Sequence, residues 1–355
     1  MFLKTINLPI ILNSLLLVSI GVLVIYSSSG ELAIQQLIFT VIGLAAFFII
    51  SIFEINSIKN LIFPLYIIIN LSLLFVLFLG IETRGSVRWI PLGIINFQPS
   101  EFAKPILILM LAQFWSKNLP TWRNIFKSLL LSLPLLFLIF KQPDLGSTLT
   151  LGAIWAGMLF ASKISLKKIL ILILIITLIG PIGWGLLHDY QKERITSFLS
   201  PQSDPLGRGY NLIQSTIAVG SGEIFGRGLG RGTQSRLQFL PEYRTDFIFA
   251  SIAEEMGFVG TLIILSLYLF LFVYCLKVAQ KSNNLFSFLA VLGVISQLLF
   301  QFFVNVGMNI GLLPITGITL PLISYGGSSL IATFFSLGFV ASVDRFSKRI
   351  DLEED

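Results

Sequence analysis

Residues 240–276 read LPEYRTDFIFASIAEEMGFVGTLIILSLYLFLFVYCL, a polar entry followed by a long apolar run. A membrane-spanning helix needs roughly 20 apolar residues, and the stretch after Asp246 supplies them. Over the whole chain of 355 residues, 55% are hydrophobic and only 12% are charged. A soluble domain of this length cannot bury so much apolar surface. The sequence therefore predicts an all-α polytopic membrane protein.

Ten apolar segments have the length expected of spanning helices. They lie near residues 10–27, 32–53, 60–80, 99–116, 125–141, 144–161, 167–187, 246–276, 285–306 and 321–342. Pro143 separates the fifth segment from the sixth, because proline removes a backbone donor and breaks the helix. We expect a single domain, residues 1–355, with about ten transmembrane helices and one large extracellular loop, residues 188–245.

Basic residues are distributed unevenly between the predicted ends of these helices. With the N-terminus in the cytoplasm, thirteen Lys and Arg lie on the cytoplasmic side, and only Arg84, Arg88 and Lys141 lie in the short outer loops. Cytoplasmic loops carry such an excess, whereas long loops cross the membrane largely regardless of charge. The distribution predicts two cytoplasmic termini and explains the net charge of +6 without a nucleic acid partner.

Several kinds of chemistry are excluded by what the sequence lacks. The single cysteine, Cys275, permits neither an internal disulfide nor a thiol metal cluster. The single histidine, His188, is the only base around which a serine triad could form, and no G-x-S-x-G elbow is present. No G-x-x-x-x-G-K-[ST] loop is present either, which argues against nucleotide-driven transport.

Glu101, Lys104 and Asp144 are candidates among the ionisable residues within or at the start of predicted spans, where charge is costly and functional roles are common. Glu101 and Lys104 are three residues apart and share a helix face, so they either form a structural ion pair or line a substrate groove. Asp144 follows Pro143 at the outer start of a helix. It is either an N-cap or an acid that lines the groove or binds a metal.

The predicted outer loop, residues 188–245, is rich in arginine. It holds seven basic residues, six of them Arg, and five acids. The planar guanidinium suits bidentate binding of phosphate, which Lys binds only as a point charge. A solvated, charged loop is the simpler alternative, but the preference for Arg favours an anionic ligand. The candidate ligands are Arg194, Arg208, Arg231 and Arg244.

Residues 314–329 form an apolar stretch that Pro and Gly interrupt. An irregular backbone exposed to lipid would leave polar groups unpaired, so this segment must pack against protein or line a cavity. Ser324 is a candidate contact for the substrate there. Close helix packing by small residues is the alternative.

Together these features predict an outward-facing groove with acids, arginines and apolar walls, suited to a phosphate-bearing lipid. Glycoside hydrolysis usually needs two carboxylates, one of which protonates the leaving group. A pyrophosphate leaving group needs only cationic stabilisation. One base with arginines, with or without a divalent cation such as Mg²⁺ or Mn²⁺, would therefore suffice for glycosyl transfer from a lipid pyrophosphate.

The chain resembles the SEDS family (shape, elongation, division and sporulation), which comprises the bacterial RodA and FtsW proteins. The matching motifs, in family order, are Arg88-Trp89, FQPSEFAK at 97–104, QPDLGS at 142–147, DPLG at 204–207, LPE at 240–242, TDFIF at 245–249, GLLP at 311–314 and SYGGS at 324–328. The GTQS stretch at 232–235 is closer to RodA and the ITLPLI stretch at 318–323 to FtsW, and the RodA branch is favoured.

The resemblance implies a peptidoglycan glycosyltransferase that polymerises lipid II on the outer face of the cytoplasmic membrane, for cell elongation or division. It also implies a class B penicillin-binding protein, a transpeptidase, as partner, with membrane lipid around both. Asp246 matches the essential acid of the family. Tyr243-Arg244 departs from the histidine that the family often carries before the Thr-Asp pair, so no histidine assists Asp246 there.

Two other functions remain open on the sequence. A flippase that moves lipid II across the membrane would use the same groove and the same intramembrane charges. A non-catalytic scaffold would only position a transpeptidase. Polymer formation in detergent separates the three, because a flippase has no second leaflet there and a scaffold makes no glycan.

Overall fold

The computed structural model describes residues 7–79, 81–83, 86–91, 96–186, 189–207, 209–237 and 239–354. Two residues singled out above, His188 and the candidate ligand Arg208, lie outside the described residues.

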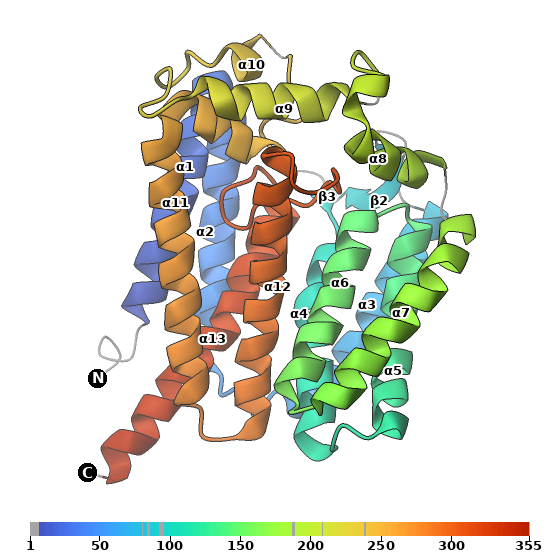
Figure 1. Ribbon diagram of the computed structural model, residues 1–355. Helices are drawn as coiled ribbons and strands as arrows, with labels where there is room; N and C mark the ends of the chain where they lie inside the picture. Colours follow the sequence, from blue (N-terminus) through green and yellow to red (C-terminus); the bar gives the residue numbers. More distant parts are fainter. Residues whose placement is uncertain are drawn as a thin grey trace.

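All ten apolar segments predicted from the sequence form helices, which stand side by side as an upright bundle (Figure 1). They are α1 (Leu8–Ser28), α2 (Gly30–Ile52), α3 (Lys59–Leu79), α4 (Pro99–Lys117), α5 (Trp122–Lys141), α6 (Leu145–Ala161), α7 (Leu166–Leu186), α11 (Ile248–Gln280), α12 (Leu285–Asn309) and α13 (Gly327–Glu354). Within the described residues, seven helices are long and apolar enough to cross a membrane. The helical, multi-pass architecture is confirmed, and the count of ten spans is approximate.

Polar residues and prolines set where several of these helices begin. The Asn7 side chain accepts the Ile10 amide at 3.4 Å and caps α1. Asp144 caps α6 by accepting the Ser147 amide at 3.0 Å. Each cap satisfies an amide that has no partner within its own helix.

The predicted last span begins later than expected. The apolar pattern placed its start near residue 321, but α13 begins at Gly327, and residues 321–326 form a turn. Leu322 adopts a positive φ of 69°, a left-handed conformation that ends helical continuity. Apolarity alone does not distinguish this buried turn from a helix.

A break in α11 is a second departure from the expected apolar helix. Gly257 has φ 67° and ψ −163°, which is not helical. The freed backbone groups pair with residues 223–228, and the Phe258 amide donates to the Glu223 carbonyl at 2.9 Å. A Cβ on Gly257 would lie 2.2 Å from the Gly226 nitrogen, so only glycine fits this close approach.

Residues 189–245, which the sequence predicted to form one large outer loop, include several helices. They contain α8 (Asp189–Leu199), a short 3₁₀ helix (Pro201–Ser203), α9 (Tyr210–Ser221) and α10 (Thr233–Arg236). These helices lie across one end of the bundle in Figure 1, and we call this region the cap. Leu212, Ser215 and Ala218 of α9 are buried, which shows how the cap is fastened to the bundle.

A small antiparallel sheet, which the sequence did not predict, lies between α3 and α4. Its strands are β1 (Ile81–Thr83), β2 (Ser86–Pro91) and β3 (Asn96–Phe97), in the order β1-β2-β3. The strands are too short for a period of two to be recognised in the sequence. The sheet sits at the same end of the bundle as the cap (Figure 1).

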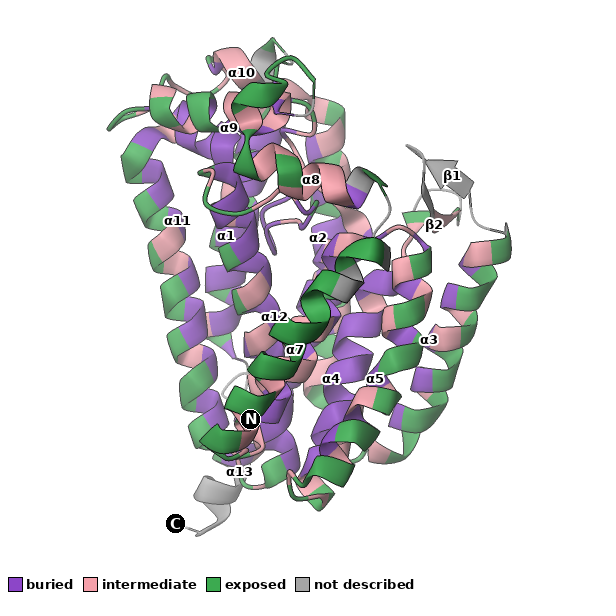
Figure 2. Cartoon of the chain, turned by 45° about the vertical axis from the view of Figure 1, so that its right-hand side comes forward, coloured by how far each residue is buried: buried purple, intermediate pink, exposed green. Residues whose placement is uncertain are grey.

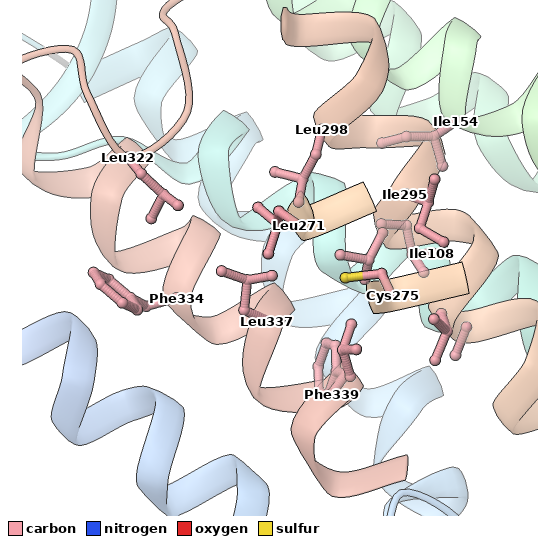
Figure 3. Packing of buried hydrophobic residues seen from close by; sticks show 14 of the residues in the cluster. Ile108, Ile154, Leu271, Cys275, Ile295, Leu298, Leu322, Phe334, Leu337 and Phe339 are labelled. Atoms are coloured by element: carbon pink, nitrogen blue, oxygen red, sulfur yellow. The ribbon is translucent and has the colours of Figure 1, made fainter. Parts of the chain in front are cut away.

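The core of the bundle lies around α4, α11, α12 and α13. Figure 3 shows Ile108, Cys275, Ile295, Leu298 and Leu337 meeting there, and each is buried. Outer helices such as α7 carry exposed faces, whereas α4 is largely buried (Figure 2). The exposed faces are apolar, as expected of helices that contact lipid.

Candidate active site

Asp246 lies in the turn that leads into α11, beneath the cap, and its side chain is partly exposed. Its backbone carbonyl accepts two hydrogen bonds from α12. The Asn305 side-chain amide donates at 2.9 Å and the Asn309 side-chain amide donates at 3.1 Å. The position of the Asp246 turn is therefore fixed by the end of α12 nearest the cap.

The backbone just before Asp246 is held by the turn at residues 320–326. The Ser324 hydroxyl donates to the Thr245 carbonyl at 2.6 Å, and the Tyr325 amide donates to the Arg244 carbonyl at 2.9 Å. Ser324 is buried, and its oxygen also accepts the Leu320 amide at 2.8 Å. Ser324, predicted to contact substrate, thus helps to shape the Asp246 turn.

The same turn is supported from α2. The Gln36 side-chain amide donates to the Ser324 carbonyl at 3.0 Å, and the Tyr325 hydroxyl donates to Gln35 Oε1 at 2.5 Å. Burial, and to a smaller extent the Glu31 carboxylate, raises the pKa of the Tyr325 phenol above its ordinary value. The phenol therefore stays protonated and keeps donating at neutral pH.

Gly317 marks the point where Asp246 and Arg194 come together. A Cβ placed on Gly317 would lie 3.5 Å from Asp246 Oδ2 and 3.8 Å from Arg194 Nη1. Gly317 has φ +75°, is exposed and carries no side chain into this space. The structure thus brings the predicted base and one predicted phosphate ligand, from the cap helix α8, to the same place.

The start of α6 packs against the backbone around Gly317, which we call the Gly317 turn. A Cβ on Gly146 would be 3.0 Å from the Thr316 carbonyl oxygen and 3.4 Å from that of Gly317. Asp144, two residues before Gly146, caps α6, which is one of the two roles that the sequence left open for it. Arg88 Nη1 lies 3.9 Å from Asp144 Oδ1. The capping role is confirmed, and a role toward substrate remains a prediction.

Glu101 and Lys104 form the ion pair that their spacing predicted. Lys104 Nζ lies 2.8 Å from Glu101 Oε2, and the two side chains are 2% and 10% exposed. At the start of the same helix, Ser100 Oγ lies 3.4 Å from Asp144 Oδ2, so the N-terminal ends of α4 and α6 meet. The pair is confirmed, and its role in a substrate groove stays a prediction.

Two further arginines lie in other surroundings. Arg244 donates from Nε to the Ser28 hydroxyl at 2.8 Å and stacks on the Tyr243 ring at 4.6 Å. It thereby joins the Asp246 turn to the end of α1. Arg231 is exposed, in the part of the cap that covers the α11 break. Of the three predicted phosphate ligands that the structure describes, Arg194, Arg231 and Arg244, it is Arg194 that lies near Asp246.

The sequence interpretation missed a row of amides on α12. Gln297, Gln301, Asn305 and Asn309 are four residues apart and all buried. Four amides at the spacing of a helical face within an apolar span are a readable signal, because buried polar groups need partners.

It also assigned no role to Glu254 and Glu255, although adjacent acids in a predicted span are just as conspicuous. Glu254 Oε1 accepts the Thr233 amide at 2.7 Å and the Gln234 amide at 2.9 Å, at the start of α10. Glu255 Oε2 accepts the Gly230 amide of the cap at 3.2 Å, and its Oε1 accepts the Ser27 hydroxyl of α1 at 3.0 Å. These two acids fasten the cap to the bundle.

The family resemblance raises the question of a divalent cation. Mg²⁺ is commonly bound by one or two carboxylates together with substrate phosphates. Among the residues that the structure describes, no three His, Cys, Asp or Glu side chains gather into a metal site.

Comparison with known proteins shows the family to which the chain belongs. The family described as "Cell cycle protein", which covers FtsW, RodA and SpoVE, matches residues 6–349. The chain belongs to this family. It is 42% identical over 289 residues to the peptidoglycan glycosyltransferase MrdB of Escherichia coli K12, covering 81% of this chain and 78% of MrdB. It is 37% identical to the stage V sporulation protein E of Bacillus subtilis, covering 96% and 98%.

Solved structures of this family share the fold. A chain from a peptidoglycan synthase complex that coordinates polymerization and crosslinking matches with a TM-score of 0.84 and 33% identity, over 96% of this chain and 98% of that one. The rod shape determining protein RodA of Thermus thermophilus, solved as wild type and as an aspartate-to-alanine mutant, matches with TM-scores of 0.72 and 0.73 at 29% identity, over 96% of this chain and 97% of each RodA chain.

Proposed function

We propose that this family member is a peptidoglycan glycosyltransferase that polymerises lipid II into glycan strands. The relatives named as such support the activity. The observation that carries the chemistry is Asp246, partly exposed beside Arg194 at the Gly317 turn, with its backbone held from α12 and from residues 320–326. A rigidly placed carboxylate next to a guanidinium suits base catalysis with an anionic leaving group.

The reaction is a single inverting displacement in which Asp246 is the general base. Its carboxylate takes the proton of the acceptor sugar's 4-hydroxyl as that oxygen attacks the anomeric carbon of the donor. The bond from the anomeric carbon to the pyrophosphate oxygen breaks, and the lipid pyrophosphate leaves with the electron pair. One carboxylate suffices because the leaving group needs no proton.

The leaving pyrophosphate is held by arginine. Arg194 is suited to this role because it lies close to the proposed base. A Cβ placed on Gly317 would lie 3.8 Å from Arg194 Nη1 and 3.5 Å from Asp246 Oδ2. The Arg194 fork can bind two phosphate oxygens at once. The Glu101–Lys104 pair and Asp144, whose helices begin side by side, shape the groove.

A transpeptidase of the penicillin-binding class is the proposed partner, and the matching chain from a peptidoglycan synthase complex supports this. We place the cap on the outer face of the membrane and both termini in the cytoplasm. Reporter fusions at Gln202 and at the C-terminus test this orientation. A cytoplasmic signal at Gln202 contradicts both the orientation and the catalytic assignment.

Elongation is the proposed cellular role, on the strength of the GTQS stretch at 232–235 and the likeness to RodA structures. Sequence identity does not decide between elongation and division, because relatives named MrdB and FtsW match this chain at the same identity. The FtsW of Haemophilus influenzae is also 42% identical, over 281 residues that cover 77% of this chain and 70% of that protein.

The decisive experiment is polymerisation by the purified full chain in detergent, with lipid II as the only substrate. Glycan strands longer than the disaccharide unit are expected. A flippase or a scaffold would leave lipid II unchanged, since neither joins sugars. Wild type without polymer, in the presence of its transpeptidase partner, would overturn the proposed activity.

A further inference from the structure

Two of the four amides on α12, Asn305 and Asn309, are fully buried at the end of the helix nearest the cap. An amide in an apolar span destabilises the fold unless it is hydrogen-bonded. The side-chain amides of both residues donate to backbone carbonyls, and that of Asn309 also lies 3.4 Å from Asn305 Oδ1. The partners of these donors connect them to the proposed site.

The amide of Asn305 bridges two separate segments. Its Nδ2 donates to the Asp246 carbonyl at 2.9 Å and to the Ile318 carbonyl at 2.7 Å. Both protons of the amide are therefore used. Ile318 follows Gly317, the residue at which Asp246 Oδ2 and Arg194 come together.

Asn309, one helical turn further, fixes the same turn from a second side. Its Nδ2 donates to the Asp246 carbonyl at 3.1 Å, and its Oδ1 accepts the Ala250 amide of the first turn of α11 at 3.1 Å. The Ser215 hydroxyl of α9 donates to the Asn309 carbonyl at 2.8 Å. The residue therefore ties the start of α11 and the cap to α12.

We propose that Asn305 and Asn309 are positioning residues, which hold the Asp246 carboxylate at a fixed separation from the Gly317 turn where the substrate pyrophosphate binds. This inference rests on the proposed function. Asn305 acts through the backbone of Asp246 and touches neither sugar. Rigid placement matters because an error of about 1 Å in a reacting group can lower the rate about 10²-fold.

If Asn305 had a purely structural role, its loss would affect the protein in the same way as the loss of any other buried amide on α12. Gln297 and Gln301, on the same face of α12, are also buried, but Gln297 Nε2 pairs with Gln301 Oε1 at 3.4 Å and its Oε1 with the Ser336 hydroxyl at 3.5 Å. These contacts lie within the core and not at the Asp246 turn. Gln297 is therefore a matched control for losing a buried amide from this helix.

The test compares Asn305→Leu with Gln297→Leu in the purified full chain. Lipid II polymerisation gives kcat and KM, and thermal unfolding gives the midpoint. For Asn305→Leu we expect kcat to fall about 10–100-fold with KM changed less than about threefold. For Gln297→Leu we expect kcat within about threefold of wild type at a similar loss of thermal midpoint. Equal losses of kcat in both variants, or wild-type kcat in Asn305→Leu, would overturn the positioning role.

Two further measurements keep the test decisive. If a leucine variant does not accumulate, Asn305→Ser and Gln297→Ser give the same comparison, because serine in a helix can bond its own backbone. Wild type and Asp246→Asn are assayed in parallel. Inactive wild type contradicts the proposed function, whereas active wild type, inactive Asp246→Asn and unimpaired Asn305 variants contradict only this inference.

Discussion

The acids near the start of α11 fall into two groups with different roles, Glu254 with Glu255 and Asp246 alone. Glu254 and Glu255 are 0% and 3% exposed, and their carboxylates accept backbone amides and a hydroxyl from the cap and α1. Asp246 is partly exposed, and Asn305 and Asn309 of α12 hold it through its backbone carbonyl. An acid anchored through its backbone keeps its side chain directed to the site, whereas an acid anchored through its carboxylate supports the fold.

Asp246→Asn should break this comparison most clearly. The substitution preserves size and the backbone bonds from α12, but the amide cannot take a proton. We expect polymerisation to fall about 10²–10⁴-fold, the usual contribution of a positioned base. The thermal midpoint and partner binding should stay as in wild type. Activity near the wild-type rate would move the search for the base to Glu101 or Asp144.

Glu101→Ala should have the next largest effect, this time on stability. Removing one partner leaves the Lys104 charge buried without compensation, at a cost of about 3–5 kcal/mol. Thermal unfolding and polymerisation should both decline. The double exchange Glu101→Lys with Lys104→Glu should partly restore stability. A fully stable and active Glu101→Ala would show that the pair is dispensable.

Glu254→Gln tests the proposal that Glu254 supports the fold, in contrast to Asp246, which acts at the site. Glutamine keeps the shape but weakens the bonds to the Thr233 and Gln234 amides at the start of α10. Hydrogen bonds to a charged group contribute about 1.5–3 kcal/mol, so stability should fall by up to that amount. Limited proteolysis should cleave the cap sooner. If kcat fell 10²-fold or more with the cap still protected, Glu254 would belong to the site instead.

Ser324→Ala should give the smallest change. It tests how far the support of the Asp246 turn extends into the neighbouring turn that holds Ser324. It removes the hydrogen bond to the Thr245 carbonyl next to Asp246. It also removes the acceptor of the Leu320 amide, and each neutral hydrogen bond contributes about 1 kcal/mol, so the thermal midpoint should fall modestly. We expect a loss of kcat of about tenfold, since the Asp246 turn loses one of its supports. Thr333→Ala, which removes a hydroxyl bond within α13, serves as control and should leave kcat unchanged.

The candidate site was partly readable before the fold was known. Asp246 stood out because a carboxylate separates a polar segment from an apolar helix, and the Glu101–Lys104 pair follows from residues three apart on one face. Arg194 could only be one of several arginines. Nothing local distinguishes it from Arg231, because its proximity to Asp246 depends on how the cap folds over the bundle.

The sequence by itself determined the membrane class and the helices of the bundle, because apolar length and prolines act locally along the chain. Only the tertiary structure decided the break at Gly257, the buried turn at 320–326 and the meeting of Asn305 with the carbonyls of Asp246 and Ile318. The physical reason is that a backbone group left unpaired by one segment is satisfied by a distant segment, and no local pattern records which segment that is.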